Sequence, residues 1–556
     1  MKTIALIIVA LSIVLAVDAT LESCDSKVYC QGMLLDVVQQ SHIFPDSKSF
    51  VDLIQIHSSE VTLRNFEELM KQTGDKPSND ELKEFVENNF VDEGELDDWT
   101  PPDFKSNPSI LKQIDDVAVR EFARSLIKIW PVLGKKMKAS VLDKPDQHSL
   151  IPVPNGFIVP GGRFKEIYYW DSYWIIEGLL ISEMEETAKG MLENFISLVE
   201  KYGFIPNGCR VYYLNRSQPP LLSLMVGLYI EATRDIEWLG KNVKTLESEL
   251  NWWLNNRTVT VEKDGVKYQL AHYAVQSNTP RPESYREDIM TCKEHPEKVS
   301  SYFRFYALKS GAESGWDFST RWIFDPSGNY PLTKINTMRV IPVDLNAFLF
   351  KAFRHMSVFY TLLGNQEKAI FWLEKSNSWQ KSIEMVHYDK ADGIWYDYDL
   401  EGKTLIKRFY PSNFAPLWTE SYEEEQRDIK GAMAAKYFTN QGVMNYEGGV
   451  PSSLIKSGEQ WDLPNAWPPL QDILITGLAN TGNEHAKKIA ETFAKRWVRA
   501  NIKGYTDTQE MFEKYDAEQP GKYGGGGEYN VQSGFGWTNG VALQFIKKYY
   551  AGKHRR

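Results

Sequence analysis

The sequence predicts a largely helical scaffold whose long loops carry the functional residues. Three observations point to this class: helical patterns recur between turns beyond residue 150, strand signals are few, and the unusual residues gather in loops between the helical stretches. A rigid frame that positions loops is a common way to build a binding or catalytic site. The sequence alone does not show how the helices close around one another.

The helical stretches can be placed in chain order from prolines and apolar spacing. Pro219-Pro220 can open a helix, and apolar residues follow at helical spacing at Leu221, Met225, Leu228, Ala232 and Ile236. Pro342 precedes a second, whose predicted buried face holds Leu345, Leu349, Ala352, Met356 and Phe359. Residues 367–386 and 483–498 also have helical patterns. Residues 258–262 and 266–270 flank Asp264-Gly265, which predicts a β-hairpin.

Composition and charge narrow the function classes. The chain has 556 residues, with 42% hydrophobic and 25% charged residues, which is typical of a globular protein. Its net charge of −11 argues against nucleic acid or an anionic membrane surface as partner. Seventeen tryptophans, 28 tyrosines and 27 phenylalanines suit carbohydrate binding.

The first 19 residues have the pattern of a secretory signal peptide. Lys2 is followed by an apolar run over 4–17, and Val17-Asp18-Ala19 is an acceptable cleavage site. The alternative is a membrane anchor, but the run is shorter than the ~20 apolar residues that span a bilayer. We therefore expect a secreted, extracellular protein that begins near Thr20 and keeps no stable membrane anchor after cleavage.

Cysteines and sequons agree with an oxidising, glycosylating compartment. Of four cysteines, Cys24 and Cys30 form a plausible disulfide, although connectivity cannot be read from sequence. Sequons begin at Asn215 and Asn256, and we favour glycosylation at Asn256, which we place in a polar loop.

Residues 160–174, PGGRFKEIYYWDSYW, are the most unusual stretch of the chain. A proline and two glycines make a turn, after which charged residues alternate with aromatic ones. Aromatic faces pack against sugar rings, while guanidinium and carboxylate groups hydrogen-bond hydroxyls. The alternative is a buried aromatic core with a structural ion pair.

As an ordered string, this stretch resembles the first signature of the trehalases, glycoside hydrolases that split α,α-trehalose. Residues 460–469, QWDLPNAWPP, resemble the family's other signature, and the two occur in the expected order. The resemblance covers most of the chain after about residue 45. It implies an all-α (α/α)6 toroidal barrel with long functional loops at one mouth. On this interpretation residues 20–149 are an N-terminal arm packing on the barrel, and residues 150–556 are the catalytic barrel.

Hydrolysis of a glycosidic bond needs one carboxylic acid and one carboxylate. The string 312–322, AESGWDFSTRW, resembles the trehalase segment that carries the acid, which assigns the acid to Asp317. Trp316 and Phe318 beside it could desolvate the carboxyl group and raise its pKa, unless the alternation of side chains in an extended segment points the two rings elsewhere. Glu513 lies in a string that resembles the base segment, and Lys514 would help to keep it ionised if it faced the same pocket. The alternative base is Glu528, next to four glycines, 524–527, that we interpret as a mobile lid.

The resemblance also implies a set of substrate-binding residues: Arg163, Trp170, Asp171, Asn207, Arg216, Ser217, Gln218, Arg281, Pro282, Glu283, Gly315 and Glu528. The arginines would hydrogen-bond hydroxyls and hold the carboxylates in position, and the alternative for each is a structural salt bridge. No residue of this set requires a metal or cofactor. No zinc spacing and no phosphate-binding P-loop occurs in the sequence.

The sequence therefore predicts a secreted, inverting α,α-trehalase that acts on trehalose. A related helical-barrel α-glucosidase is one alternative. A non-catalytic sugar-binding protein is the other, and it would be favoured if either predicted catalytic carboxylate were replaced.

Overall fold

Residues 24–293 and 301–552, the part of the chain that this computed structural model describes, contain a closed ring of six inner helices. Each packs on the next, and the last packs on the first. The ring is made by α8 (Asp171–Ile181), α10 (Leu222–Thr233), α14 (Val343–Leu362), α16 (Ala415–Thr419), α18 (Pro468–Asn480) and α20 (Gly536–Tyr550). Helices such as α8 and α18 are apolar around most of their circumference, as expected for helices buried on all sides.

A second layer of amphipathic helices covers this ring. It is made by α5 (Val117–Ile127), α9 (Glu185–Tyr202), α11 (Ile236–Asn256), α15 (Gln366–His387), α17 (Arg427–Asn440) and α19 (Glu484–Thr508). These helices bury one face and expose the other, which is typical of an outer layer. The two layers confirm the predicted (α/α)6 barrel.

Two glycines let the first and last inner helices approach closely enough to close the ring. A Cβ on Gly540 of α20 would lie 1.9 Å from the backbone oxygen of Trp174 in α8. A Cβ on Gly178 of α8 would lie 2.9 Å from the Cα of Gly540. Any larger residue at either position would therefore push α8 and α20 apart.

The remaining elements lie in the arm and in the loops. The other helices are α1 (Met33–Gln40), α2 (Ser47–Val51), α3 (Ser59–Thr73), α4 (Asn79–Asn89), α6 (Trp130–Leu133), α7 (Ala139–Asp143), α12 (Tyr285–Lys293) and α13 (Ser301–Glu313). The paired strands, all antiparallel, are β1 (Ile54–Gln55) with β2 (Phe90–Val91), β4 (Gly134–Met137) with both β3 (Leu96–Asp98) and β5 (Phe157–Ile158), β6 (Thr258–Lys263) with β7 (Val266–Ala271), β11 (Asp397–Asp399) with both β8 (Val340–Ile341) and β12 (Thr404–Ile406), β9 (Tyr388–Asp389) with β10 (Ile394–Trp395), and β13 (Asn465–Ala466) with β14 (Tyr515–Asp516).

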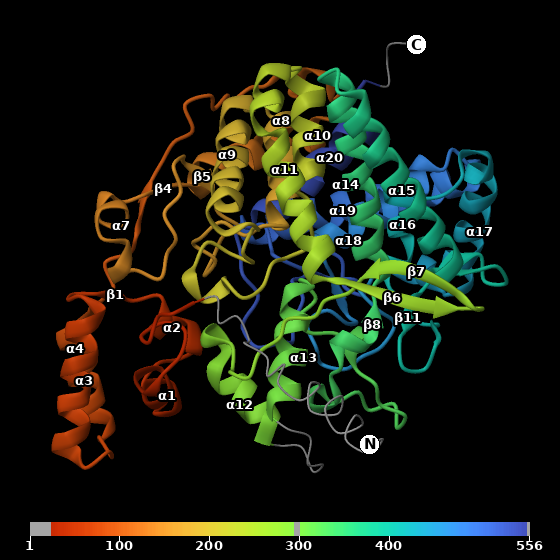
Figure 1. Cartoon of the computed structure of the whole chain (residues 1–556). Coiled ribbons are helices and arrows are strands. Elements are labelled where there is room, and N and C mark those ends of the chain that lie inside the picture. The colour runs from red at the N-terminus through yellow and green to blue at the C-terminus, as the bar shows by residue number, and fades with distance from the viewer. Residues whose placement is uncertain (1–23, 294–300, 553–556) are drawn as a thin grey trace, which may run out of the picture.

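The N-terminal residues contribute to two hydrophobic cores. Apolar residues of α1 to α4 form a small core of their own, which Tyr168, Tyr212 and Tyr213 join from the barrel side. Residues from Ile110 to Val141 belong instead to the main core of the barrel, where α5 packs on α20. Figure 1 shows α1 and α2 at the same end of the barrel as α12 and α13.

The structure confirms most of the predicted elements. The predicted face of α14, from Leu345 to Phe359, is buried, and β6 and β7 form the hairpin around Asp264 and Gly265. One prediction was wrong: the helix after Pro219-Pro220 ends at Thr233, and Ile236 begins α11. The chain breaks there because Arg234 adopts a left-handed conformation, φ 58°, and Asp235 caps α11 by accepting a hydrogen bond from the Trp238 amide.

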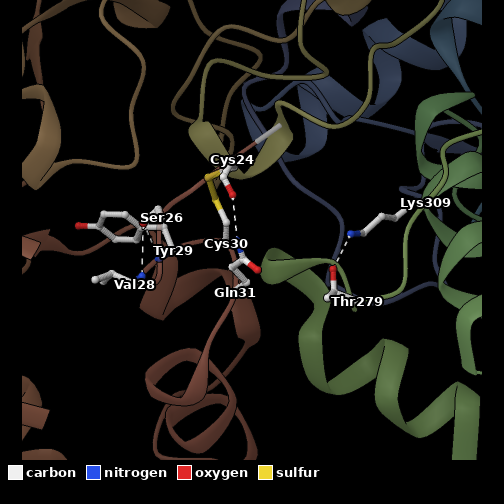
Figure 2. The surroundings of a disulfide bond; sticks show 8 residues. All are labelled: Cys24, Ser26, Val28, Tyr29, Cys30, Gln31, Thr279 and Lys309. Atoms are coloured by element: carbon white, nitrogen blue, oxygen red, sulfur yellow. Dashed lines mark hydrogen bonds between the residues drawn. A yellow bond between two sulfur atoms is a disulfide. The ribbon is translucent and has the colours of Figure 1, made fainter. Parts of the chain in front are cut away.

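The predicted Cys24–Cys30 disulfide is present at the start of the described chain (Figure 2). Next to it, the hydroxyl of Ser26 accepts hydrogen bonds from the amides of Val28 and Tyr29. The Tyr29 hydroxyl donates to the backbone oxygens of Leu53 and Gln147, so the disulfide-bonded turn is tied to the rest of the arm. The predicted signal peptide, residues 1–19, lies outside the described residues.

Candidate active site

A cavity opens among the long loops. The loops that lead into α8, α10, α18 and α20 supply much of its wall. Of the residues predicted for the site, those that line the cavity are Arg163, Trp170, Asp171, Asn207, Arg216, Gln218, Arg281, Glu283, Gly315, Asp317, Glu513 and Glu528. Segments more than 300 residues apart in sequence thus meet at one place.

Asp317, the predicted acid, follows α13 on the segment 314–318. Burial raises the pKa of its carboxyl group from 3.8 to about 7; the nearby charge of Arg281 lowers it and that of Glu528 raises it. The rings beside it in sequence do not line the cavity: Trp316 packs against Trp461, and Phe318 lies under the Arg281 guanidinium. Asp317 is thus desolvated as expected, and its two neighbouring rings lie in the buried part of the protein and not at the cavity surface.

Glu513, the predicted base, lies between α19 and β14 and is almost fully buried. The Tyr529 hydroxyl donates to its Oε1 at 2.8 Å, and the Gln532 amide donates to Oε2 at 3.4 Å. Burial raises the pKa of Glu513, while the Lys514 charge and the Tyr529 hydrogen bond oppose that rise. Lys514 donates to Gln460 and to the Gly526 carbonyl, so it acts on Glu513 through its charge.

Asp171 is a third carboxyl group at the cavity. It is the first residue of α8, and its pKa lies well above the ordinary value because it is buried and because the charges of Glu513 and Asp317 are near. Three carboxyl groups within electrostatic reach of one another cannot all ionise cheaply near neutral pH. This arrangement favours a site in which at least one of them holds a proton.

The three predicted arginines are held by carboxylates or stacked on rings. Arg281 binds Asp288 with two nitrogens and donates to Glu528 at 2.9 Å. Arg216 donates to Glu283 at 2.6 Å and lies over the Tyr213 ring. Within the described residues, Nε and Nη1 of Arg216 are buried without a hydrogen-bond partner. Arg216 itself lines the cavity.

Arg163 joins the base to the arm. Its guanidinium lies over the Tyr529 ring, 5.1 Å from the centroid, and 3.5 Å from Asp46. Tyr529 in turn binds Glu513, so Arg163 supports the residue that orients the predicted base.

The amides and the glycine are fixed by the backbone. Asn207 Nδ2 donates to the carbonyls of Ser217 and Ala312, and Gln218 Oε1 accepts from the Trp170 amide. Gly315 has φ +77°, and a Cβ there would lie 2.8 Å from the Trp170 ring. The chain can therefore pass over this tryptophan only with glycine at that position.

The second sequence signature ties the acid, the base and the glycine-rich loop together. Gln460 donates to the Asp317 carbonyl and accepts from Lys514, which is next to the base. Asp462 accepts hydrogen bonds from Ser319 and from the amide and hydroxyl of Thr320. Asn465 exchanges hydrogen bonds with Gly525 in the glycine-rich loop. This segment therefore sets the relative positions of three parts of the site.

Two predicted binding residues lie behind the cavity wall. The Ser217 hydroxyl donates to the Ile205 carbonyl, and its amide donates to Glu313. Pro282 begins the 3₁₀ turn Pro282–Ser284, and its carbonyl accepts from Gln39. Neither residue lines the cavity, and a role for them in binding stays a prediction.

Sequence reasoning missed several residues that line the cavity. Trp461, Trp467, Phe535 and Trp537 form an aromatic wall, in which the Trp461 and Trp467 rings stack with centroids 4.0 Å apart. All four lie inside motifs that the sequence made conspicuous, so a closer interpretation of those motifs could have found them. Lys48, from the short helix α2, also lines the cavity, and no sequence pattern pointed to it.

Comparison with known proteins agrees with the sequence signatures. The family model for trehalase matches residues 42–550. A trehalase of Tenebrio molitor is 56% identical over 530 residues, covering 95% of this chain and 96% of that protein. The chain belongs to the trehalase family. A human trehalase is 46% identical, covering 95% of this chain and 90% of that protein.

Solved structures agree with the fold of this trehalase family member. A neutral trehalase of Saccharomyces cerevisiae superimposes with a TM-score of 0.57 at 24% identity, covering 72% of this chain and 74% of that one. At this identity the likeness supports the barrel fold alone.

Proposed function

We propose that this chain hydrolyses α,α-trehalose to two glucose molecules by an inverting acid/base mechanism, with Asp317 as acid and Glu513 as base. The observation that carries the proposal is that both carboxyl groups line one cavity in a chain of the trehalase family. Their surroundings also suit the two roles. Asp317 has a pKa of about 7, which lets it hold a proton near neutral pH, while burial raises the pKa of Glu513 and Lys514 and Tyr529 oppose that rise.

In this mechanism, Glu513 takes a proton from a water molecule as the water oxygen attacks the anomeric carbon of one glucose. The bond between that carbon and the bridging oxygen breaks, and Asp317 gives its proton to the leaving oxygen. The attacked glucose leaves with inverted configuration, and the second glucose keeps its own. The net change is the addition of one water molecule across the glycosidic bond.

Trehalose carries no charge, so the arginines serve a different purpose from charge matching. Arg216 lines the cavity and can hydrogen-bond sugar hydroxyls, and Arg281 holds Glu528 and lies near Asp317. The aromatic wall of Trp461, Trp467, Phe535 and Trp537 gives the cavity an apolar surface next to which sugar rings can pack.

Removal of either catalytic carboxyl group tests these roles. We expect Asp317→Asn and Glu513→Gln each to lower kcat on trehalose by roughly 10²–10⁴-fold, the usual contribution of general acid or base catalysis. Melting temperatures would show that both variants fold. Glu84→Gln, an exposed carboxylate on α4, is the matched control and should keep full activity. Activity near that of the unmodified chain in either site variant would overturn its assignment.

The substrate itself is tested by a panel of glucose disaccharides. Trehalose should give a higher kcat/KM than maltose or isomaltose. A preference for either of the latter would favour the related α-glucosidase.

We also propose that the protein is secreted and glycosylated. The Cys24–Cys30 disulfide supports an oxidising compartment, and Asn256 is exposed at the last turn of α11, not in the polar loop that the sequence suggested. No helix in the described part of the chain has the length and apolar character of a membrane span. Expression in a secretory host should release into the culture medium a protein that begins near Thr20 and loses mass on deglycosylation. A secreted protein with an intact Met1 would contradict the cleavage.

A further inference from the structure

The arm reaches the substrate cavity through one short helix. Helix α2 packs against the 3₁₀ turn Pro282–Ser284, which carries Glu283. Its Lys48 side chain is buried, 4% exposed, and lines the cavity. The Lys48 ammonium donates at 2.7 Å to Asp52, at 2.7 Å to Glu166 and at 3.1 Å to the Tyr212 hydroxyl. All three N–H donors of Lys48 are therefore used by protein groups. Its position at the cavity is explained by these contacts, without a direct contact to a sugar.

Glu166 passes this contact on to the cavity wall. It is fully buried, and the oxygen that accepts from Lys48 also accepts from the Tyr168 hydroxyl at 2.5 Å. Its other oxygen lies 3.4 Å from Nε of Arg210. Without Lys48, this buried carboxylate would keep only the longer contact with Arg210 as charge compensation, and it would be drawn away from Tyr168.

Tyr168 is packed into the sugar-facing wall. Its ring meets Phe164 and Tyr213 edge to face, and its hydroxyl lies 2.9 Å from that of Tyr213. The Tyr213 ring lies under the guanidinium of Arg216, the arginine with two free buried donors. A chain of contacts thus runs from Lys48 through Glu166 and the two tyrosines to Arg216.

The arm also holds the part of the wall that carries Glu283. Gln39 donates to the Pro282 carbonyl at 3.1 Å. The Ser47 hydroxyl donates to Glu287 at 2.8 Å and accepts from the Arg286 amide at 3.2 Å. Because Glu283 lies between these points and binds Arg216, α1 and α2 together fix the segment that carries this partner of Arg216.

We propose that Lys48 is a positioning residue for the substrate site, which sets the place of Tyr168 and Arg216 through its ion pair with Glu166. The arm is then part of the functional unit and not only a covering layer. This inference rests on the proposed function, because the effect of Lys48 is measured as a change in KM for trehalose.

The test compares Lys48→Met, Tyr168→Phe and the double variant in the full mature chain. If Lys48 acts through Tyr168, each single change raises KM for trehalose about tenfold, and the double change raises it about tenfold and not a hundredfold, because linked residues are not additive. We expect kcat to change far less than KM. Lys83→Met, at an exposed position of α4, is the control and should leave KM unchanged.

Two readouts separate positioning from simple support of the fold. An unchanged KM in Lys48→Met with only a lower melting temperature, or a double variant with multiplied effects, would overturn the proposal. If Lys48→Met does not fold, combining Lys48→Met with Glu166→Gln removes both charges together. An unchanged KM in that double variant would also overturn the proposal. Trehalose binding measured by calorimetry in an Asp317→Asn background should weaken in parallel with KM. Failure of the unmodified chain to cleave trehalose would count against the proposed function instead.

Discussion

Burial raises the pKa of both predicted catalytic carboxyl groups, but different neighbouring charges and hydrogen bonds oppose this rise in each. For Asp317, the charge of Arg281 lowers the pKa and the charge of Glu528 raises it, and together with burial they give a pKa of about 7. Glu513 has Lys514 and the Tyr529 hydroxyl, both of which favour the carboxylate. In the proposed mechanism these different surroundings assign the donor role to Asp317 and the acceptor role to Glu513, although the two groups have the same chemistry in water.

We therefore expect kcat/KM for trehalose to be bell-shaped against pH. Above about pH 7, Asp317 loses the proton that it must donate, so activity falls. Toward acidic pH, Glu513 takes up a proton at a pKa above the ordinary 4.5 and can no longer accept one from water. Rates of the free enzyme measured between about pH 4 and about pH 9 check both limbs.

A matched variant identifies the group behind the alkaline limb. The Glu528 charge raises the pKa of Asp317, so Glu528→Gln should move this limb to lower pH, whatever it does to the maximal rate. An alkaline limb that stays in place, or moves to higher pH, would contradict the assignment of Asp317.

A buried lysine gives a separate prediction for stability. Lys309 of α13 donates to the hydroxyls of Ser277 and Thr279, the latter contact being drawn in Figure 2, and burial lowers its pKa from 10.5 to about 7. Between those two pH values the unfolded chain holds a proton that the folded chain lacks, so this group makes stability rise with pH. The loss of folding stability that the lowered pKa of Lys309 causes is fully present below pH 7.

Lys309→Met should flatten this dependence. Near the middle of the window, the slope of unfolding free energy against pH should fall by up to about 1.4 kcal/mol per pH unit. Denaturant titrations at several pH values give the slope, and Lys83→Met provides the control. Parallel curves for the unmodified chain and Lys309→Met would show that Lys309 keeps an ordinary pKa.

At the residue scale, the sequence was informative where motifs are long and silent where contacts are indirect. Asp317 and Glu513 could be proposed from ordered strings around them. Lys48 could not, because α2 has only five residues and its partner Glu166 is 118 residues away. The raised pKa of Asp317 was also predictable, although the rings of Trp316 and Phe318 do not line the cavity.

At the scale of elements, the glycine-rich loop joins the substrate-binding and base residues. Residues 524–527 precede Glu528, which binds Arg281, and Tyr529, which binds Glu513. Gly526 has φ +77°, and a Cβ there would lie 2.4 Å from the Gly458 carbonyl oxygen. The loop is thus fitted closely to the segment before the second signature, and its motion as a lid stays a prediction.

Gly526→Ala should displace this loop and lower kcat/KM for trehalose by about tenfold or more, since an alanine in this conformation costs roughly 1–2 kcal/mol before any clash. The melting temperature should change little, because the loop lies outside the barrel core. Gly525→Ala is the matched control, with nothing within 4 Å of the added Cβ. Equal kcat/KM values in the two variants would show that the fit at Gly526 does not matter.

Helix boundaries show what periodicity can and cannot provide. The buried face of α14 was predictable because its apolar residues follow one helical stripe that continues to Phe359. The break between α10 and α11 was not, because the apolar spacing runs on to Ile236 while Arg234 turns the chain. A left-handed arginine leaves no signal of the kind that a glycine would give.

At the scale of the whole molecule, closure of the ring depends on contacts that no local pattern encodes. Gly178 and Gly540 permit α8 and α20 to meet although they are separated by more than 350 residues. Helix α5 packs on α20 and shares the core of the barrel, while residues 28–90 form their own small core. The division at residues 149 and 150 stays a prediction, since the family resemblance gave the barrel but not the part that each N-terminal helix plays in it.

The central claim, inverting hydrolysis of trehalose at this cavity, is tested most directly by following the first glucose anomers by proton NMR. The purified protein is mixed with trehalose, and spectra are recorded before the products mutarotate. Equal amounts of α- and β-glucose are expected, since one sugar is inverted and the other is released unchanged. Formation of α-glucose alone would contradict inversion by Asp317 and Glu513, and the absence of any glucose would contradict trehalose as the substrate.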